Sequence, residues 1–212
     1  MFQLENVKYK GIVSIDSLTI EEGKITAVIG KSGGGKSTLL KLLNKMLSPS
    51  EGSIYFRGQP LSELPSVEHR RKVLYLNQTP HIFEGTLRHN LLQGFQYQGK
   101  KSPGDAALKA MLKKVHLDLS LDKAASTLSG GEAQRLALAR ILLLDGEVYL
   151  FDEPSSALDE KSEMDVLNSV IESLRTLGKT VVLVTHSKDV ALKHADVIYR
   201  VHNGTVKEAD HE

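Results

Sequence analysis

The chain of 212 residues contains no cysteine. Without cysteine, a disulfide framework, a cysteine-ligated metal and a cysteine nucleophile are all excluded. The absence also fits a protein of the reducing cytosol. We therefore expect stability to come from a hydrophobic core, and any catalysis to use other side chains.

Long hydrophobic runs and an excess of one charge are also missing. The richest apolar stretch, LALARILLL, is short and is broken by Arg140, whereas a membrane span needs about 18 apolar residues. The N-terminal MFQLENVKYK lacks the apolar run of a signal peptide. Lys and Arg total 27 against 26 Asp and Glu, which argues against a nucleic-acid partner and a polybasic membrane anchor. We expect a soluble protein that reaches a membrane only through a partner.

Strand-like and helix-like patterns alternate along most of the chain. Short β-type runs ended by turn residues predict strands at Phe2–Val7, Ile12–Ile20, Ile25–Gly30, Gly52–Gly58, Lys72–Leu76, Val148–Phe151, Thr180–Thr185 and Val197–Val201. Helices are predicted over Ser37–Leu47 and Glu160–Leu177. This alternation indicates an α/β fold with a parallel sheet covered by helices.

The middle of the chain has a different character. Residues 80–145 contain few β-type runs, and helices are predicted at Thr86–Leu92, Ala106–Val115 and Glu132–Leu144, with a polar loop at Gln96–Gly104. We therefore expect one domain over residues 1–212, with a core of about 1–78 and 146–212 and a helical subdomain of about 79–145.

Residues Gly30–Ser37 read GKSGGGKS and match the pattern G-x-x-x-x-G-K-[ST]. An apolar strand precedes them and an amphipathic helix follows. Glycines allow successive backbone N–H groups to turn toward an anion, and the helix start adds partial positive charge. Lys36 can then reach the β- and γ-phosphates, and the Ser37 hydroxyl can bind Mg²⁺. The alternative is a flexible strand–helix turn without a ligand.

The stretch VYLFDEP places Asp152 and Glu153 at the end of a buried strand. Buried carboxylates are costly unless they have a task. In a phosphate-loop protein, the first carboxylate holds Mg²⁺ through a water, and the second can polarise a water that attacks the γ-phosphorus. The alternative is that Asp152 caps a helix that begins near Pro154.

With these motifs, further ones fall into a recognisable order. Gln78 follows a strand, LSGGE occupies Leu128–Glu132, SALD occupies Ser156–Asp159 and His186 ends TVVLVTH. In this order the chain resembles the ATP-binding cassette (ABC) ATPase family along essentially its whole length. The resemblance implies a P-loop NTPase core with a mixed or parallel sheet, an N-terminal antiparallel β-subdomain and a helical insertion.

The resemblance also implies roles for single residues. ATP would be bound by Tyr9, Gly30, Lys31, Ser32, Gly33, Gly34, Gly35, Lys36, Ser37 and Thr38, with Tyr9 stacked on adenine. Lys31 departs from the proline of many relatives. Gln78 would touch Mg²⁺ or the attacking water, Glu153 would act as general base, and His186 would contact the γ-phosphate. Mg²⁺ would be held by Ser37, Gln78 and Asp152, and Asp159 would organise a subunit contact. The alternatives are a surface tyrosine for Tyr9, an ordinary loop amide for Gln78, an incidental histidine for His186 and a solvated carboxylate for Asp159.

The LSGGE motif is a second possible anion site at a helix start. Ser129, Gly130, Gly131 and Glu132 head a helix whose first N–H groups lack intrahelical acceptors. The alternative is a simple helix cap. The resemblance implies that this turn contacts the ATP held by a second copy, so that two chains pair head-to-tail around two ATP molecules.

The remaining expected partner is a separate integral membrane permease, which would hold the ATPase at the cytoplasmic, inner face of the membrane. The segment after Gln78, QTPHIFEGTLRHNLL, is similar to that of export-type ATPases, and the short chain resembles bacterial iron-export subunits of the FetA type. An importer subunit for phosphate, amino acids or a similar substrate remains open, as does a soluble ABC ATPase without a transport role. A small-molecule phosphotransferase would not need LSGGE, and a nucleotide sensor would not need Glu153 and His186.

Overall fold

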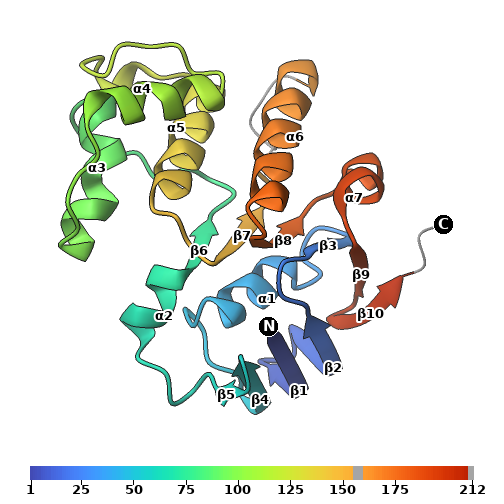
Figure 1. The fold of residues 1–212 in the computed structure, drawn as a ribbon. Helices are drawn as coiled ribbons and strands as arrows, with labels where there is room; N and C mark the ends of the chain where they lie inside the picture. The colour runs from blue at the N-terminus through green and yellow to red at the C-terminus, as the bar shows by residue number, and fades with distance from the viewer. Residues whose placement is uncertain (155–159, 210–212) are drawn as a thin grey trace. The chain divides into compact units, whose positions relative to one another are not determined.

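The computed structural model describes residues 1–154 and 160–209, which belong to two compact units (Figure 1). The first unit contains Met1–Tyr75, Glu147–Glu153 and Leu174–Glu212. The second contains Leu76–Gly146 and Pro154–Ser173.

A ten-stranded sheet runs in the order β5-β4-β1-β2-β10-β9-β3-β8-β7-β6 through the described residues. Its strands are β1 (Phe2–Tyr9), β2 (Val13–Ile20), β3 (Ile25–Gly30), β4 (Glu51–Phe56), β5 (Gln59–Pro60), β6 (Val73–Leu76), β7 (Val148–Asp152), β8 (Thr180–Val184), β9 (Val197–His202) and β10 (Thr205–Ala209). Strands β1, β2, β4 and β5 pair antiparallel, whereas β3 pairs parallel with β8 and β9, and β7 with β8. The sheet is therefore mixed, as expected, with an antiparallel N-terminal part.

Burial along the strands explains this division. Strands β1 and β2 alternate buried and exposed positions, which suits a sheet with one face in solvent. All five residues of β7 and of β8 are buried, as in a parallel strand covered on both faces. The motifs that follow β3, β7 and β8 therefore start from the most constrained part of the sheet.

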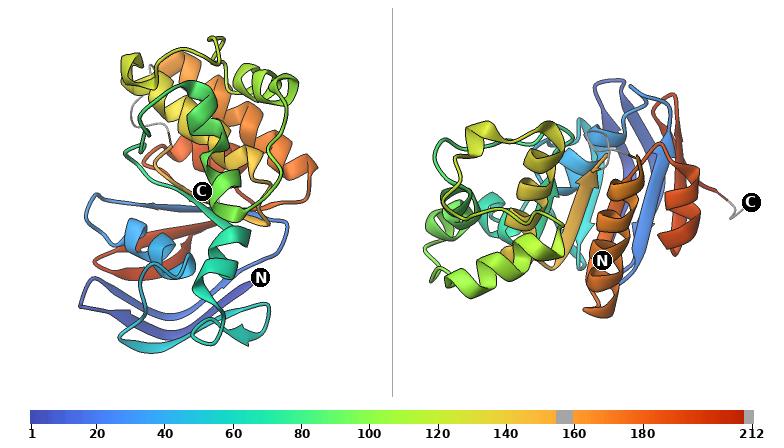
Figure 2. Two further views of the ribbon diagram at one scale, coloured as in Figure 1. Left: turned by 90° about the vertical axis from the view of Figure 1, so that its left-hand side faces the viewer. Right: turned by 90° about the horizontal axis from the view of Figure 1, so that it is seen from above.

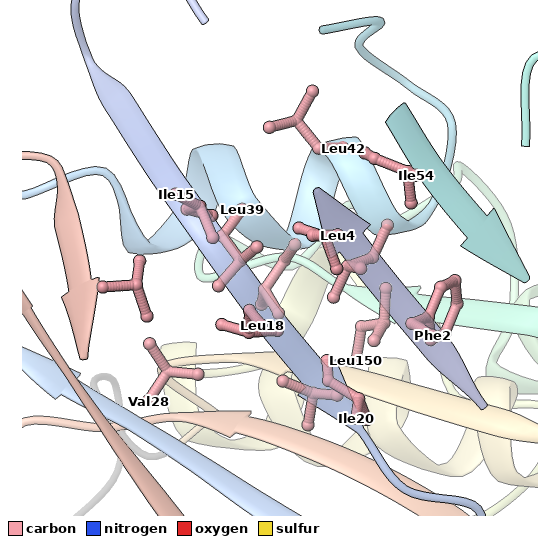
Figure 3. Packing of buried hydrophobic residues seen from close by; sticks show 14 of the residues in the cluster. Phe2, Leu4, Ile15, Leu18, Ile20, Val28, Leu39, Leu42, Ile54 and Leu150 are labelled. Atoms are coloured by element: carbon pink, nitrogen blue, oxygen red, sulfur yellow. The ribbon is translucent and has the colours of Figure 1, made fainter. Parts of the chain in front are cut away.

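Helix α1 (Lys36–Leu43) packs its leucines onto the sheet and begins directly at the phosphate loop. Figure 3 shows Leu39 and Leu42 of α1 among side chains from β1, β2, β4 and β7. Burying a leucine of this kind contributes about 1.5–3 kcal/mol. Helix α7 (Lys188–His194) contacts β3, and its Ala191 packs with Ala27 and Ile198.

The second unit is mainly helical. Helix α5 (Gly130–Leu143) packs against α3 (Leu87–Gln98) and α4 (Asp105–Lys114), and Figure 2 shows these three grouped together. A short 3₁₀ turn, Ala125–Thr127, precedes α5. Helix α6 (Glu160–Thr176) follows β7 in the chain. Within the described ranges, no helix has both the length and the apolar character to cross a membrane.

Several element boundaries differ from those expected. Helix α1 ends at Leu43 rather than Leu47, because Lys45 adopts a left-handed φ of 57°. Helix α3 extends through Gln98 into the expected polar loop and ends at Gly99, whose φ is 62°. The short elements α2 (Ser66–Lys72), α7 and β10 were not expected, since few apolar residues mark α2 and β10.

Candidate nucleotide-binding site

The phosphate loop, residues Gly30–Ser37, connects β3 to α1 in the first unit. Gly33 and Gly35 have φ values of 75° and 101°, which favour glycine. A Cβ on Gly30 would lie 2.3 Å from the Val201 carbonyl oxygen, and one on Gly35 would lie 2.9 Å from the Ile12 carbonyl oxygen. The surrounding backbone therefore leaves no room for larger residues at these two positions.

Lys36 is the cation of this loop, and only 4% of it is exposed. Its Nζ donates hydrogen bonds to the carbonyl oxygens of Gly30 at 2.8 Å and Lys31 at 3.0 Å. The same Nζ lies 3.8 Å from Glu153 Oε1. A buried ammonium needs such partners, and here they keep it inside the loop where a phosphate would be cradled.

Ser37, Asp152 and Tyr75 form a chain of hydrogen bonds. Ser37 Oγ donates to Asp152 Oδ1 at 2.9 Å, and the Tyr75 hydroxyl donates to Asp152 Oδ2 at 2.7 Å. Asp152 is 1% exposed. Burial, together with this hydrogen bond and the Asp152 charge, raises the pKa of Tyr75, so it stays a donor. A hydroxyl and a carboxylate at hydrogen-bond distance fit Mg²⁺, which takes a few protein oxygens together with phosphate and water.

Glu153 and His186 also meet directly. His186 Nε2 lies 2.6 Å from Glu153 Oε1, with Glu153 mostly buried and His186 about half exposed. Glu153 has a φ of 47°, and its N–H donates to the Val184 carbonyl at 3.1 Å. Non-glycine residues in this region of φ carry strain that is commonly stored at functional sites. Four expected site residues, Lys36, Asp152, Glu153 and His186, are thus brought together with Ser37.

Tyr9 and the outer part of the loop lie close to two hairpin turns. The Lys10 ammonium lies 5.4 Å from the centroid of the half-buried Tyr9 ring. An open hollow of about 490 Å³ is lined on one side by Lys31, Ser32, Gly33 and Gly34, and on the other by Gly11, Ile12 and residues 201–204. Tyr9 is not among the lining residues of that hollow. Thr38, next to Ser37 in α1, is partly buried.

The signature turn, residues Ser129–Glu132, lies in the second unit. Ser129 caps α5, and its Oγ accepts a hydrogen bond from the Glu132 N–H at 3.3 Å. Glu132 Oε2 in turn accepts from the Ser129 N–H at 2.8 Å, which completes a capping box. This hydrogen bond lowers the pKa of Glu132. Ser129 therefore caps α5, and Gly130 and Gly131 occupy its first turn, where N–H groups lack intrahelical acceptors.

Two expected residues are not placed in this cluster, and one unexpected residue joins it. Gln78 belongs to the second unit and is exposed, with its N–H donating to Asn77 Oδ1 at 3.1 Å. Asp159 lies outside the described residues. Tyr75 was missed because its strand, KVLYL, reads as buried core. The one available signal was a hydroxyl in a strand otherwise made of aliphatic residues.

The combination of a glycine-rich loop between a buried strand and a helix with an acidic strand end defines a P-loop nucleotide-binding protein. A family model described as "ABC transporter" matches residues 13–156. The chain therefore belongs to the ABC transporter family, and it is an ABC ATPase domain, which binds and hydrolyses ATP.

Named relatives share this domain. Protein STAR1 of Oryza sativa is 41% identical over 90% of this chain, which spans only 55% of that protein's length. The "Probable iron export ATP-binding protein FetA" of Escherichia coli is 35% identical over all of this chain and 96% of its own. Other relatives carry names from energy-coupling factor, multidrug and siderophore transport at 32–34% identity.

A solved structure matches the whole fold. The ATP-binding cassette MJ0796, solved as a dimer in a post-hydrolysis state with ADP and phosphate, has a TM-score of 0.86 to this chain at 27% identity. The match covers 100% of this chain and 99% of MJ0796. The fold is thus that of an ABC ATPase, including the antiparallel N-terminal strands.

Proposed function

We propose that this chain is the ATP-hydrolysing subunit of an ABC transporter and works as a head-to-tail pair. The observation that carries the proposal is the cluster in the first unit, where Lys36, Ser37, Asp152, Glu153 and His186 meet by direct contacts. This set supplies a phosphate-binding cation, oxygen ligands for a divalent cation and a carboxylate for a water. Those are the parts that phosphoryl transfer to water needs.

Each residue of the cluster has a separable task. The loop N–H groups and Lys36 bind and orient the phosphates, and the Ser37 hydroxyl and Asp152 carboxylate hold Mg²⁺. Mg²⁺ neutralises charge on the β- and γ-phosphate oxygens when it is bound. Glu153 accepts a proton from the attacking water. His186 lies against Glu153 Oε1 and orients that carboxylate. Its proposed second task is to contact the γ-phosphate when ATP is bound.

Pairing of two chains follows from the second unit. The signature turn offers backbone N–H groups and the Ser129 hydroxyl at a helix start, without a lysine among its own residues. A helix start of this kind favours an anion, and we propose that here the anion is a phosphate of ATP held by the other chain. The dimeric state named for MJ0796 supports pairing around nucleotide. In the proposed pair, Asp159 organises the contact between the two chains. Gln78 contacts either Mg²⁺ or the attacking water.

The pair powers a separate membrane permease at the inner face of the membrane. The favoured cargo is iron, and the favoured direction is export. Support comes from the match to FetA over nearly the full length of both chains. An importer subunit is the second candidate, because an energy-coupling factor ATPase is 34% identical over 91% of this chain. Copurification with the permease, followed by an ATPase assay, distinguishes them: iron should stimulate turnover, and phosphate or amino acids should not.

The central test is the substitution Glu153→Gln. It keeps the shape of the side chain and removes its base, so ATP with Mg²⁺ should trap a dimer that elutes at twice the monomer mass. Glu208→Gln, an exposed substitution on β10, is the matched control and should hydrolyse ATP normally without being trapped. A Glu153→Gln protein that remains monomeric with ATP would remove the main support for the pair.

A second substitution tests which chain the signature turn serves. Ser129→Arg fills the turn with a bulky side chain while leaving the phosphate loop intact. Hydrolysis should be abolished, and ATP binding to the isolated chain should be nearly unchanged. Equal loss of binding would mean that Ser129 acts on nucleotide held by its own chain.

A further inference from the structure

The Gln78 segment, residues Gln78–Thr86, contains neither helix nor regular strand, yet side chains from two helices fasten it. The first is Asn90 of α3, which is fully buried. Asn90 Oδ1 accepts from the Phe83 N–H at 2.8 Å, and its Nδ2 donates to the carbonyls of Phe83 at 2.9 Å and Thr86 at 3.0 Å. These bonds hold the C-terminal half of the segment to α3, the helix that directly follows it.

The second fastening comes from α5. Arg140 Nη2 donates to the His81 carbonyl oxygen at 2.8 Å, across 59 residues of sequence. The Arg140 guanidinium also lies 5.0 Å from the centroid of the Phe83 ring. The His81 and Phe83 rings meet edge to face at 4.7 Å. Arg140 therefore contacts both the backbone and a side chain of the segment, close to Gln78.

An arginine at position 140 lowers the stability of the folded chain. Burial lowers the pKa of its guanidinium, and its Nη1 is buried without a hydrogen-bond partner among the described residues. Arg140 as a whole is only partly buried, but leaving its Nη1 buried without a partner costs stability that an apolar side chain of similar length would not. Packing alone therefore does not account for an arginine here, whereas a directed bond to the segment does.

Helix α5 connects this bond to the signature turn. Ser129 caps one end of α5, and Arg140 lies in its last turns, about 16 Å away along the helix axis. At the other side of the bond, His81 is only three residues from Gln78. One continuous helix and one hydrogen bond therefore link the signature turn to the backbone three residues from Gln78.

We infer that Arg140 is a positioning residue that ties Gln78 to the helix bearing the signature turn, so that engagement of that turn sets the position of Gln78 for hydrolysis. The inference rests on the proposed function, because it takes from it the roles of Gln78 and of the signature turn. Arg140 touches neither ATP nor Mg²⁺ in this account, and it acts through the His81 carbonyl.

The test is a steady-state ATPase assay of the full chain with Arg140→Met, which keeps a long apolar stem and removes the donor. We expect kcat to fall about tenfold to a hundredfold, as for displaced positioning groups, and KM for ATP to change less than about twofold. Arg140→Lys keeps a donor and should recover part of kcat. Arg88→Met is the control, since Arg88 pairs with Asp105 and Asp122 in the same unit and should leave kcat unchanged.

A double-mutant cycle with Gln78→Ala separates positioning from general damage. If Arg140 acts through Gln78, Arg140→Met should lower kcat much less in the Gln78→Ala background than in the wild type. Equal factors in both backgrounds would overturn the inference, as would a full kcat in Arg140→Met. If the methionine variant does not fold, judged by its thermal melt, the same cycle is run with Arg140→Lys.

The outcome is distinguishable from failure of the proposed function. A Glu153→Gln protein that hydrolyses ATP at the wild-type rate would contradict the proposed function itself. A Gln78→Ala protein with full kcat, beside an inactive Glu153→Gln protein, would overturn the inference about Arg140 and the role given to Gln78, while the ATPase function proposed for the chain would stand.

Discussion

Two glycine-rich turns head helices in this protein, and they are built on opposite principles. In the phosphate loop, neighbouring backbone leaves no room for a side chain at Gly30 or Gly35, and the buried Lys36 ammonium binds two loop carbonyl oxygens. In the signature turn, a Cβ on Gly130 would meet no atom within 4 Å. The charged side chain there is a carboxylate, Glu132, which belongs to a helix cap.

The difference teaches how far each turn can act alone. The phosphate loop holds a buried cation, Lys36, and its Ser37 hydroxyl donates to the buried Asp152 carboxylate of the same unit. In the signature turn, the Ser129 and Glu132 N–H groups are used in the helix cap, and no cation stands among residues 129–132. Under the proposed function, a second chain brings the phosphate. Four predictions, from the largest expected effect to the smallest, test this contrast and the contacts that support the phosphate loop from Asp152 and from α1.

Alanine at single glycines should separate the two turns most sharply. Gly30→Ala places a methyl group 2.3 Å from the Val201 carbonyl, so the free energy of unfolding should fall by about 3 kcal/mol or more. Gly130→Ala meets open space in a helix and should stabilise by up to about 1 kcal/mol. Urea unfolding of both variants measures this, and equal losses would contradict the contrast.

Removing the Tyr75 hydroxyl should show how much its hydrogen bond to the buried Asp152 carboxylate stabilises the fold. Tyr75→Phe leaves a buried carboxylate without one donor, so unfolding free energy should fall by about 1.5–3 kcal/mol. Tyr199→Phe is the matched control, because its hydroxyl donates to the neutral Thr19 carbonyl at 2.9 Å and should cost only about 1 kcal/mol. If chemical unfolding shows the same loss of stability for both variants, the hydrogen bond to the charged Asp152 is no stronger than the one to the neutral Thr19 carbonyl.

The first unit should lose stability in mildly acidic solution because of His69. Burial, with the positive charges of Lys45, Arg70 and Lys72, lowers the pKa of His69, although its Nε2 bond to the Leu43 carbonyl opposes this. The folded state therefore favours the neutral imidazole. Its contribution is complete above the usual pKa of 6.5 and is lost as pH falls from there through the lower folded pKa.

Unfolding free energies measured from pH 7.5 to 5 check this point. The His69 contribution should decline by no more than about 1.4 kcal/mol per pH unit. His69→Phe keeps the ring contacts with Phe2 and Phe56 and should give a flatter profile. Parallel profiles for the two proteins would contradict the assignment.

The signature turn should respond only at lower pH, and more weakly. The Ser129 N–H bond lowers the pKa of Glu132, so this stabilisation is present above the usual value of 4.5 and is lost as pH falls through the lower folded pKa. Glu132→Gln should remove that pH dependence, and Ser129→Ala should cost about 1 kcal/mol at neutral pH. Thermal melts at pH 7 and pH 3 measure both effects, and an unchanged Glu132→Gln profile would contradict them.

The fold class and the main motifs could be predicted from the sequence because each depends on local signals. The apolar run before Gly30 and the acidic residues after Phe151 mark buried strand ends without any tertiary information. The phosphate loop is similarly local, since its glycines and Lys36 are contiguous. ABC family membership is confirmed by comparison with known proteins.

What could not be predicted depends on contacts between distant segments. Tyr75 reaches Asp152 across 77 residues, and no pattern in KVLYL marks its hydroxyl. The requirement for glycine at position 30 comes from Val201, which is remote in sequence. The early end of α1 depends on Lys45, whose Nζ donates to the Ser62 and Leu64 carbonyls. The roles of Gln78 and Asp159 stay predictions.

The position of β10 has a consequence for synthesis on the ribosome. Strand β10 lies between β2 and β9, and the Ser14 N–H donates to the Gly204 carbonyl at 2.8 Å. The antiparallel strands, translated first, therefore have no neighbour on that side until residues near 205 emerge. The phosphate loop is translated within the first forty residues. Its Gly30 likewise lacks the neighbouring backbone of Val201 until β9 has been translated. A nascent chain halted before β9 should thus carry the complete ATP-binding motif and be unable to form its pocket.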